Sequence, residues 1–113
     1  MIVAIIEFRI RPGAEALYAE WAERLHARVN EIDGFVSVER FESRTRPGTW
    51  LSLSYWRDAA ALAAWRREPE HVKGMAAGKR DVFADYRIVV ADIERDYAFK
   101  HAGAPAGRAA AGG

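Results

Sequence analysis

The chain opens on an apolar segment in which Ile, Val and Phe dominate up to a Pro-Gly pair. Residues 2–11 therefore predict a β-strand that ends in a turn. Near its start the strand is apolar on both faces, with Ile2 and Ala4 on one and Val3 and Ile5 on the other. We expect such a strand to be covered on both sides in the folded protein.

The hydrophobic pattern changes to a helical one over residues 14–32. Leu17, Trp21, Leu25 and Val29 recur at the spacing that brings side chains onto one helix face, and charged residues fall between them. This pattern predicts an amphipathic helix with one buried stripe. An Asp-Gly pair follows and ends the helix.

Period-two alternation marks two further strands, residues 35–43 and residues 50–56, joined by a turn at residues 45–48. Asp58 follows the second of these strands. Its carboxylate is suited to accept the free backbone N–H groups in the first turn of a helix. A second, Ala-rich helix is therefore expected to run from this cap to Arg67.

The next part of the chain predicts a short helical continuation and one last strand. Pro69 suits the first turn of a helix, and Gly78 ends that helix. Residues 86–97 alternate again and predict a strand. The element order is βαββαβ, which is the ferredoxin-like α+β fold with an antiparallel sheet.

One face of this sheet must take the two helices, and the other face then needs a different cover. The second face is expected to carry Val3, Ile5, Leu51 and Leu53. A contiguous apolar patch of this kind usually marks an interface. We therefore expect a homodimer in which two sheets pack face to face as a dimeric α+β barrel.

Size and composition agree with one small domain. The chain has 113 residues, of which 50% are hydrophobic, and we expect a single domain over residues 1–100. The Ala- and Gly-rich tail, residues 101–113, has little to pack and is expected to be disordered.

Charge and cysteine content narrow the partners and the chemistry. The net charge is +1, from 17 basic and 16 acidic residues, which gives no electrostatic reason to expect nucleic acid or an anionic membrane as partner. The sequence contains no cysteine, so disulfides and thiolate chemistry are excluded. The first apolar segment is too short to span a bilayer and lacks the features of a signal peptide, so we expect a cytoplasmic protein.

Four short motifs follow one another along the chain: Ile32-Asp33-Gly34-Phe35, Ser54-Tyr55-Trp56-Arg57-Asp58, Ala61-Leu62 with Trp65, and Glu70-His71. On a βαββαβ frame this combination resembles the antibiotic biosynthesis monooxygenase (ABM) family, over residues 2–97. The resemblance implies a dimeric α+β barrel with a pocket in each subunit, between the sheet and the helices. Since family members differ in chemistry, it indicates the fold more strongly than the reaction.

The resemblance favours a cofactor-independent monooxygenase that uses O2 on a small aromatic or quinol-type substrate. Without flavin or metal, the substrate must be its own reductant. The protein then supplies an apolar pocket, a proton acceptor and hydrogen-bond donors for developing oxyanions. We expect His71 and Trp65 to be catalytic, with His71 as proton relay. Further residues can bind the substrate, as apolar walls or as donors: Trp56, Phe83, Tyr86, and Arg80 or Arg87.

Structural roles compete with these functional ones. Trp65 has the spacing of a core residue, and His71 begins a short helix, where a surface or packing role is the more natural one. His26, His71 and His101 are too scattered to form a metal triad, so we expect no metal site.

Two alternative functions stay open. The haem-degrading branch of the family resembles this chain at Trp56 and Trp65, but Gly74 and Met75 stand about where that branch has its iron-binding His. Ile6 stands where it has an Asn. The other alternative is a non-catalytic dimeric protein that binds a small ligand or acts as a stress-associated accessory protein.

Overall fold

The computed structural model describes residues 1–103 and residue 105. Most of the tail that the sequence predicts to be disordered, residues 101–113, lies outside these described residues. Within the described part of the chain, no helix is long and apolar enough to cross a membrane.

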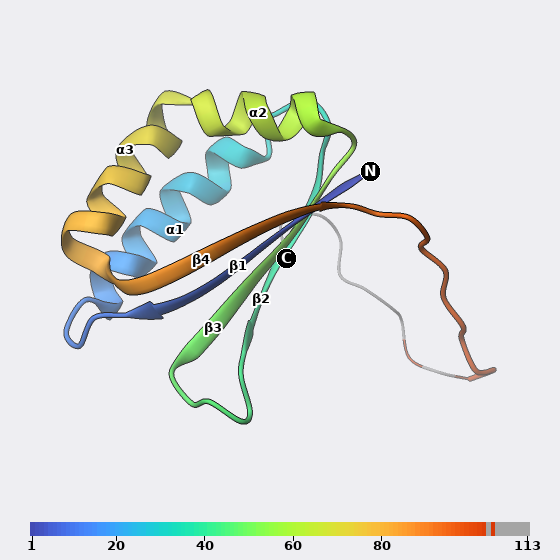
Figure 1. Cartoon of the computed structure of the whole chain (residues 1–113), viewed down its shortest axis with the longest axis horizontal. Coiled ribbons are helices and arrows are strands. Elements are labelled where there is room, and N and C mark those ends of the chain that lie inside the picture. The colour runs from blue at the N-terminus through green and yellow to red at the C-terminus, as the bar shows by residue number, and fades with distance from the viewer. Residues whose placement is uncertain (104, 106–113) are drawn as a thin grey trace.

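The fold has four strands and three α-helices, and all three helices lie on the same side of the sheet (Figure 1). In chain order the elements are β1 (Ile2–Ile10), α1 (Glu15–Val29), β2 (Phe35–Glu42), β3 (Thr49–Trp56), α2 (Ala59–Arg67), α3 (Pro69–Ala77), a π-helical turn η1 (Gly78–Val82) and β4 (Phe83–Asp92).

The sheet has the order β2-β3-β1-β4, and all neighbouring strands are antiparallel. This is the predicted ferredoxin-like α+β fold, in which the first and the last strand of the chain, β1 and β4, pair with each other. The prediction from the hydrophobic pattern is therefore confirmed for the element order and the sheet.

The last strand differs from its predicted range, residues 86–97. β4 begins earlier because an irregularity in β1 between Arg9 and Ile10 brings Phe83 opposite Ile10. It ends at Asp92 because Asp92 pairs with Ile2, the first residue of β1, and no further partner strand follows. The π-helical turn before β4 was not predicted either.

Local capping fixes how the chain enters α2. Oδ1 of Asp58 accepts a hydrogen bond of 2.9 Å from the backbone N–H of Ala61, as predicted for an N-cap. Gly34 has a φ of +91°, and a Cβ at this position would lie 2.6 Å from the Cβ of Ala61. The turn before β2 therefore needs glycine both for its backbone conformation and for the close approach of α2.

The core lies between the sheet and the helices. It contains a cluster of buried residues from both layers: Ile2, Ala4, Val29, Trp56 and Ala61. Trp56 is only 2% exposed. Because side chains alternate along a strand, the residues between these core positions point away from the helices.

The opposite side of the sheet is not covered by any described residue of the chain, and we call it the open face (Figure 1). The pairs Val3–Tyr55 and Ile5–Leu53 lie across it, which agrees with the expected position of Leu53. One end of the open face is charged, because Glu7 pairs there with Arg46.

Candidate active site

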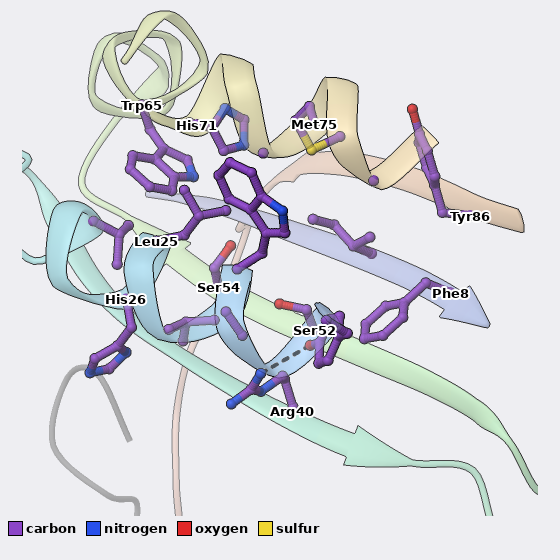
Figure 2. A pocket seen from close by; sticks show the side chains of 18 of the residues that line it. Phe8, Leu25, His26, Arg40, Ser52, Ser54, Trp65, His71, Met75 and Tyr86 are labelled. Carbon is purple, nitrogen blue, oxygen red and sulfur yellow. Dashed lines mark hydrogen bonds between the residues drawn. The ribbon is translucent and has the colours of Figure 1, made fainter. Parts of the chain in front are cut away.

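A cavity of about 210 Å3 lies between the helix-covered side of the sheet and helices α1 and α3. Figure 2 shows labelled side chains around it from strands β1 to β4 and from helices α1, α2 and α3. Most of the lining is aromatic or aliphatic. A cavity of this shape can enclose a small apolar molecule and keep water away from it.

Five of the predicted site residues line this cavity: Trp56, Trp65, His71, Phe83 and Tyr86. They come from β3, α2, α3 and β4, so the fold brings together residues that are up to 30 positions apart in the chain. The structure thus brings these five side chains together around one cavity.

Arg87 and Arg80 do not line the cavity, although the sequence offered them as oxyanion donors. Arg87 stands opposite Glu7 on the open face, and its Nε lies 3.8 Å from the Glu7 carboxylate. Neighbouring residues on a strand point to opposite faces, so Arg87 cannot share the cavity with Tyr86. Arg80 is exposed and its Nε lies 2.7 Å from the carboxylate of Asp81.

Two helices fix the backbone position of His71. Its N–H donates to Oε2 of Glu68 over 2.9 Å, which caps the first turn of α3. Nη2 of Arg28, on α1, donates to Oε1 of the same carboxylate over 2.8 Å. Since Glu68 binds both partners at once, it holds the start of α3 against α1.

The imidazole of His71 lies beside the indole of Trp65, with ring centroids 4.6 Å apart. Its Nδ1 is buried and has no hydrogen-bond partner among the described residues. Burial lowers the pKa of His71, and the Arg66 carbonyl and the Glu68 carboxylate offset only part of this effect. The ring is therefore neutral at pH 7 and has one nitrogen that can accept a proton.

Trp56 forms a fixed wall of the cavity. Its Nε1 donates to Oγ of Ser54 over 2.9 Å, so the buried indole N–H is satisfied. The ring of Phe35 packs edge-on against it at a centroid distance of 5.2 Å. Because its polar atom and its ring both have partners, Trp56 is held in one orientation.

Another group of aromatic rings lies where β1 and β4 meet α1. Phe8 lies 5.4 Å from both Tyr18 and Phe83, measured between ring centroids. Tyr86 continues the group, 5.7 Å from Phe83. These contacts order the rings at this end of the cavity.

Sequence reasoning missed the polar residues at the β2 side of the cavity. Nη1 of Arg40 donates to the hydroxyl of Tyr18 over 3.0 Å, and both residues line the cavity. Arg40 is labelled in Figure 2. Tyr18 could have been found, because it lies three residues before Trp21 on the same helix face. Arg40 could not, because a charged residue on an alternating strand normally faces solvent.

Two glycines of α3 and η1 keep the cavity open. A Cβ on Gly74 would lie 2.9 Å from Cδ1 of Leu25, and one on Gly78 would lie 2.7 Å from the ring of Phe83. A larger residue at either position would therefore push a wall of the cavity inward.

The cavity lining includes two histidines, His26 and His71, and one acidic residue, Glu39. Within residues 1–103 and residue 105, no group of three His, Cys, Asp or Glu side chains is arranged to hold a metal ion. The lining offers imidazoles for proton transfer at His71 and at the exposed His26, and hydrogen bonding at Arg40, Tyr18 and the strand serines.

Comparison with known protein families decides the assignment. The family model described as "Antibiotic biosynthesis monooxygenase" matches residues 1–77. The chain belongs to this family. The match runs from β1 to the end of α3 and so includes Trp56, Trp65 and His71.

Curated relatives of the ABM domain extend this result. The chain is 36% identical to the jasmonate monooxygenase ABM of Pyricularia oryzae over 93 residues, which are 82% of the chain and 43% of that protein. It is 28% identical to the uncharacterized protein YqjZ of Bacillus subtilis over 97 residues, 86% of the chain and 83% of that protein. The matched part of the chain thus covers less than half of the Pyricularia protein.

Solved structures resemble the ABM domain in fold. Rv0793 from Mycobacterium tuberculosis superimposes with a TM-score of 0.75 at 18% identity, over 86% of this chain and 98% of the other. A crystal structure of an antibiotic biosynthesis monooxygenase gives a TM-score of 0.72 at 18% identity, over 84% of this chain and all of the other (100%). At these identities the likeness concerns the arrangement of strands and helices.

Proposed function

We propose that this ABM-family chain is a cofactor-independent monooxygenase that uses O2 to oxidise a small aromatic or quinol-type substrate. The single observation that carries the proposal is the buried, unpartnered Nδ1 of His71 in an aromatic cavity. A buried polar atom without a partner costs free energy unless a ligand or another group satisfies it. A substrate hydroxyl is such a group.

The reaction can be written so that atoms and electrons balance. The substrate gives a proton to His71, in the tautomer that leaves Nδ1 unprotonated, and becomes an electron-rich anion. That anion reduces O2. For an anthrone-type CH2 group, one oxygen atom forms the new C=O, and the other leaves as water with the two hydrogens. The substrate supplies all four electrons, so no outside reductant is needed.

The other predicted site residues shield His71 and hold the substrate: Trp65 and the cavity walls Trp56, Phe83 and Tyr86. Trp65 covers the His71 ring and keeps it from water, which maintains the lowered pKa. The walls pack on the faces of an aromatic substrate. A cavity of about 210 Å3 is smaller than the ~300–1,000 Å3 of sites for drug-sized ligands, so we expect a compact substrate.

A haem group does not fit the cavity as it stands. Haem is larger than a typical drug-sized ligand and needs more room than the 210 Å3 available. The indole of Trp65 also occupies one side of the His71 ring. The proposed reaction therefore involves no haem. We expect the Soret band of haemin to stay unshifted when the protein is added.

The test of the proposal is oxygen uptake with a panel of hydroquinones and anthrones. We expect uptake above the autoxidation rate with at least one of them, and a loss of at least tenfold in the variant His71→Ala. His101→Ala is the matched control, because His101 is exposed and outside the cavity. Uptake at the autoxidation rate throughout the panel would favour a non-catalytic ligand-binding protein.

Jasmonate belongs in the same panel of test compounds, because the Pyricularia relative is named a jasmonate monooxygenase. Jasmonate has no phenol and no anthrone-type CH2 group. Turnover of jasmonate, with no reaction of any aromatic compound, would agree with a monooxygenase activity. It would contradict the proposal that the substrate is aromatic.

We also propose that the protein is a cytoplasmic homodimer. The support for the dimer is the open face, where Ile5 and Leu53 lie side by side and no described residue covers them. Apolar surface of this kind is buried by a second copy at a gain of about 25 cal/mol for each Å2 removed from water. The partner would lie on the side of the sheet away from the cavity.

A further inference from the structure

The side chain of Arg40 lines the cavity and has no acidic partner among the described residues, whereas seven other arginines do. Arg9, Arg24, Arg28, Arg46, Arg57, Arg80 and Arg87 all form ion pairs with Asp or Glu. Among the ion pairs of residues 1–103 and 105, none involves Arg40, although it lines a mostly apolar cavity. A guanidinium in this place is always charged and has donors to spare.

The sheet topology explains why Arg40 faces the cavity. It lies on the outer strand β2, opposite Ser52 of β3. Ser52 is on the same side of the sheet as Ser54, which is buried beneath the helices. Arg40 is itself exposed and also lines the cavity, so it stands at the cavity mouth (Figure 2).

Three hydrogen-bond donors meet at this mouth. Arg40 uses one N–H on the hydroxyl of Tyr18 and keeps its others. Because Tyr18 accepts that bond, its own hydroxyl proton is available to a ligand. Ser52 also lines the cavity, and its hydroxyl takes part in no hydrogen bond among the described residues.

The carboxylate of Glu39 is not a competitor for this group of donors. Glu39 is the one acidic residue in the cavity lining within the described chain. It pairs in register with Leu53, and alternation therefore directs its side chain to the open face. The charge of Arg40 is thus left for a ligand.

We propose that Arg40, Tyr18 and Ser52 form a subsite for the carboxylate of a small, otherwise apolar acid. The inference rests on the proposed function only in that it names the substrate class, which is aromatic acids. The carboxylate of such an acid would bind at Arg40, and its ring would lie among the tryptophans. A planar guanidinium matches the two oxygens of a carboxylate, and the neighbouring hydroxyls add donors to the same group.

The subsite makes a prediction about binding that needs no turnover. We would titrate the protein under nitrogen with 2-naphthoate and with its neutral isostere 2-naphthamide, by isothermal titration calorimetry. One charge-assisted interaction corresponds to roughly a tenfold or greater preference for the acid. The variant Arg40→Gln should lose this preference, and Tyr18→Phe should reduce it.

Arg44→Gln is the matched control, because Arg44 is exposed, lies four residues further along and is not part of the cavity lining. Arg40→Lys tests the geometry, since it keeps the charge and loses the planar fork; we expect an intermediate preference. Thermal unfolding of each variant checks that the fold is retained.

The outcomes separate this inference from the proposed reaction. Failure of the wild-type protein to bind 2-naphthoate, equal affinity for the two probes, or an unchanged preference in Arg40→Gln would each overturn the subsite. Oxygen uptake with neutral hydroquinones alongside such a result would leave the reaction standing. A preference that depends on Arg40, without oxygen uptake, would support the subsite and remove the reaction.

Discussion

The indole of Trp65 lies against the imidazole of His71, with ring centroids 4.6 Å apart and ring planes inclined by 41°. The contact joins the end of α2 to the start of α3 and places both rings in the cavity lining. It also excludes water from His71, and this burial is the main cause of the lowered pKa. The titration of His71 is therefore the property of the site that can be tested most simply.

We predict that activity falls as the pH drops below the ordinary histidine value of 6.5, because protonated His71 cannot accept a proton from the substrate. The inflection in kcat/KM should lie below 6.5, since the pKa is lowered. His71→Gln should lower the rate and remove this acid limb, whereas His101→Gln should keep it. An acid limb that survives in His71→Gln would assign the titration to another group.

The same shift predicts a dependence of stability on pH. The folded protein resists protonation of His71, and the unfolded chain does not, so stability is complete above pH 6.5 and declines as the pH falls below it. Urea unfolding at pH 7.5 and pH 5.5 measures this difference. The loss between these values should be smaller in His71→Gln than in the wild-type protein.

Gly74→Ala tests how tightly α3 packs over the cavity. The added Cβ would lie 2.9 Å from Cδ1 of Leu25 and 3.3 Å from Cε3 of Trp21. Overpacking costs ~1–3 kcal/mol, which exceeds the ~1 kcal/mol that alanine gains over glycine in a helix. We expect a less stable protein with weaker binding of 2-naphthoate.

Ala76→Gly is the control for that substitution, because Ala76 is exposed on the same helix. It should lose helix propensity alone and leave ligand binding unchanged. A Gly74→Ala protein more stable than the wild type, with full affinity for the ligand, would mean that α3 is free to move away.

Asp58→Ala should lower the melting temperature by a few degrees, because the backbone N–H of Ala61 loses its acceptor. The same hydrogen bond, with help from Arg57, holds the pKa of Asp58 below its usual value. Asp96→Ala serves as control, since Asp96 is exposed beyond the last strand. Equal melting temperatures for the two variants would show that the cap contributes nothing.

Leu53→Asp should convert the proposed homodimer into monomers, because it puts a charge opposite Ile5 on the open face. Val72→Asp is the control, as Val72 is 52% exposed on α3, away from that face. Size-exclusion chromatography with light scattering gives the mass of each variant. A Leu53→Asp protein that stays dimeric would place the interface elsewhere.

The order of the elements could be predicted from the sequence because the hydrophobic period changes at each boundary. Leu17, Trp21, Leu25 and Val29 mark α1, and the alternation around Trp56 marks β3. The π-helical turn carries no such period, and the end of β4 depends on where β1 begins. Features of this kind are set by the pairing of distant segments and leave no local pattern.

The aromatic part of the candidate site was predictable, and its charged part was not. Trp65 and His71 stand near each other in the chain, within the segment that the family model matches. The choice between Arg87 and Arg40 depends on strand register. Arg87 pairs with Glu7 on the open face, while Arg40 pairs with Ser52 on the cavity side. Only the assembled sheet distinguishes the two.

The central claim, that His71 promotes the reaction of O2 with a substrate in the cavity, is tested most directly by isotope labelling. An anthrone is incubated with the protein under 18O2, and the product is analysed by mass spectrometry. The account predicts one labelled oxygen per product, formed faster than without protein, with the excess rate lost in His71→Ala and kept in His101→Ala. Labelling at the protein-free rate, or an excess that survives in His71→Ala, would contradict it.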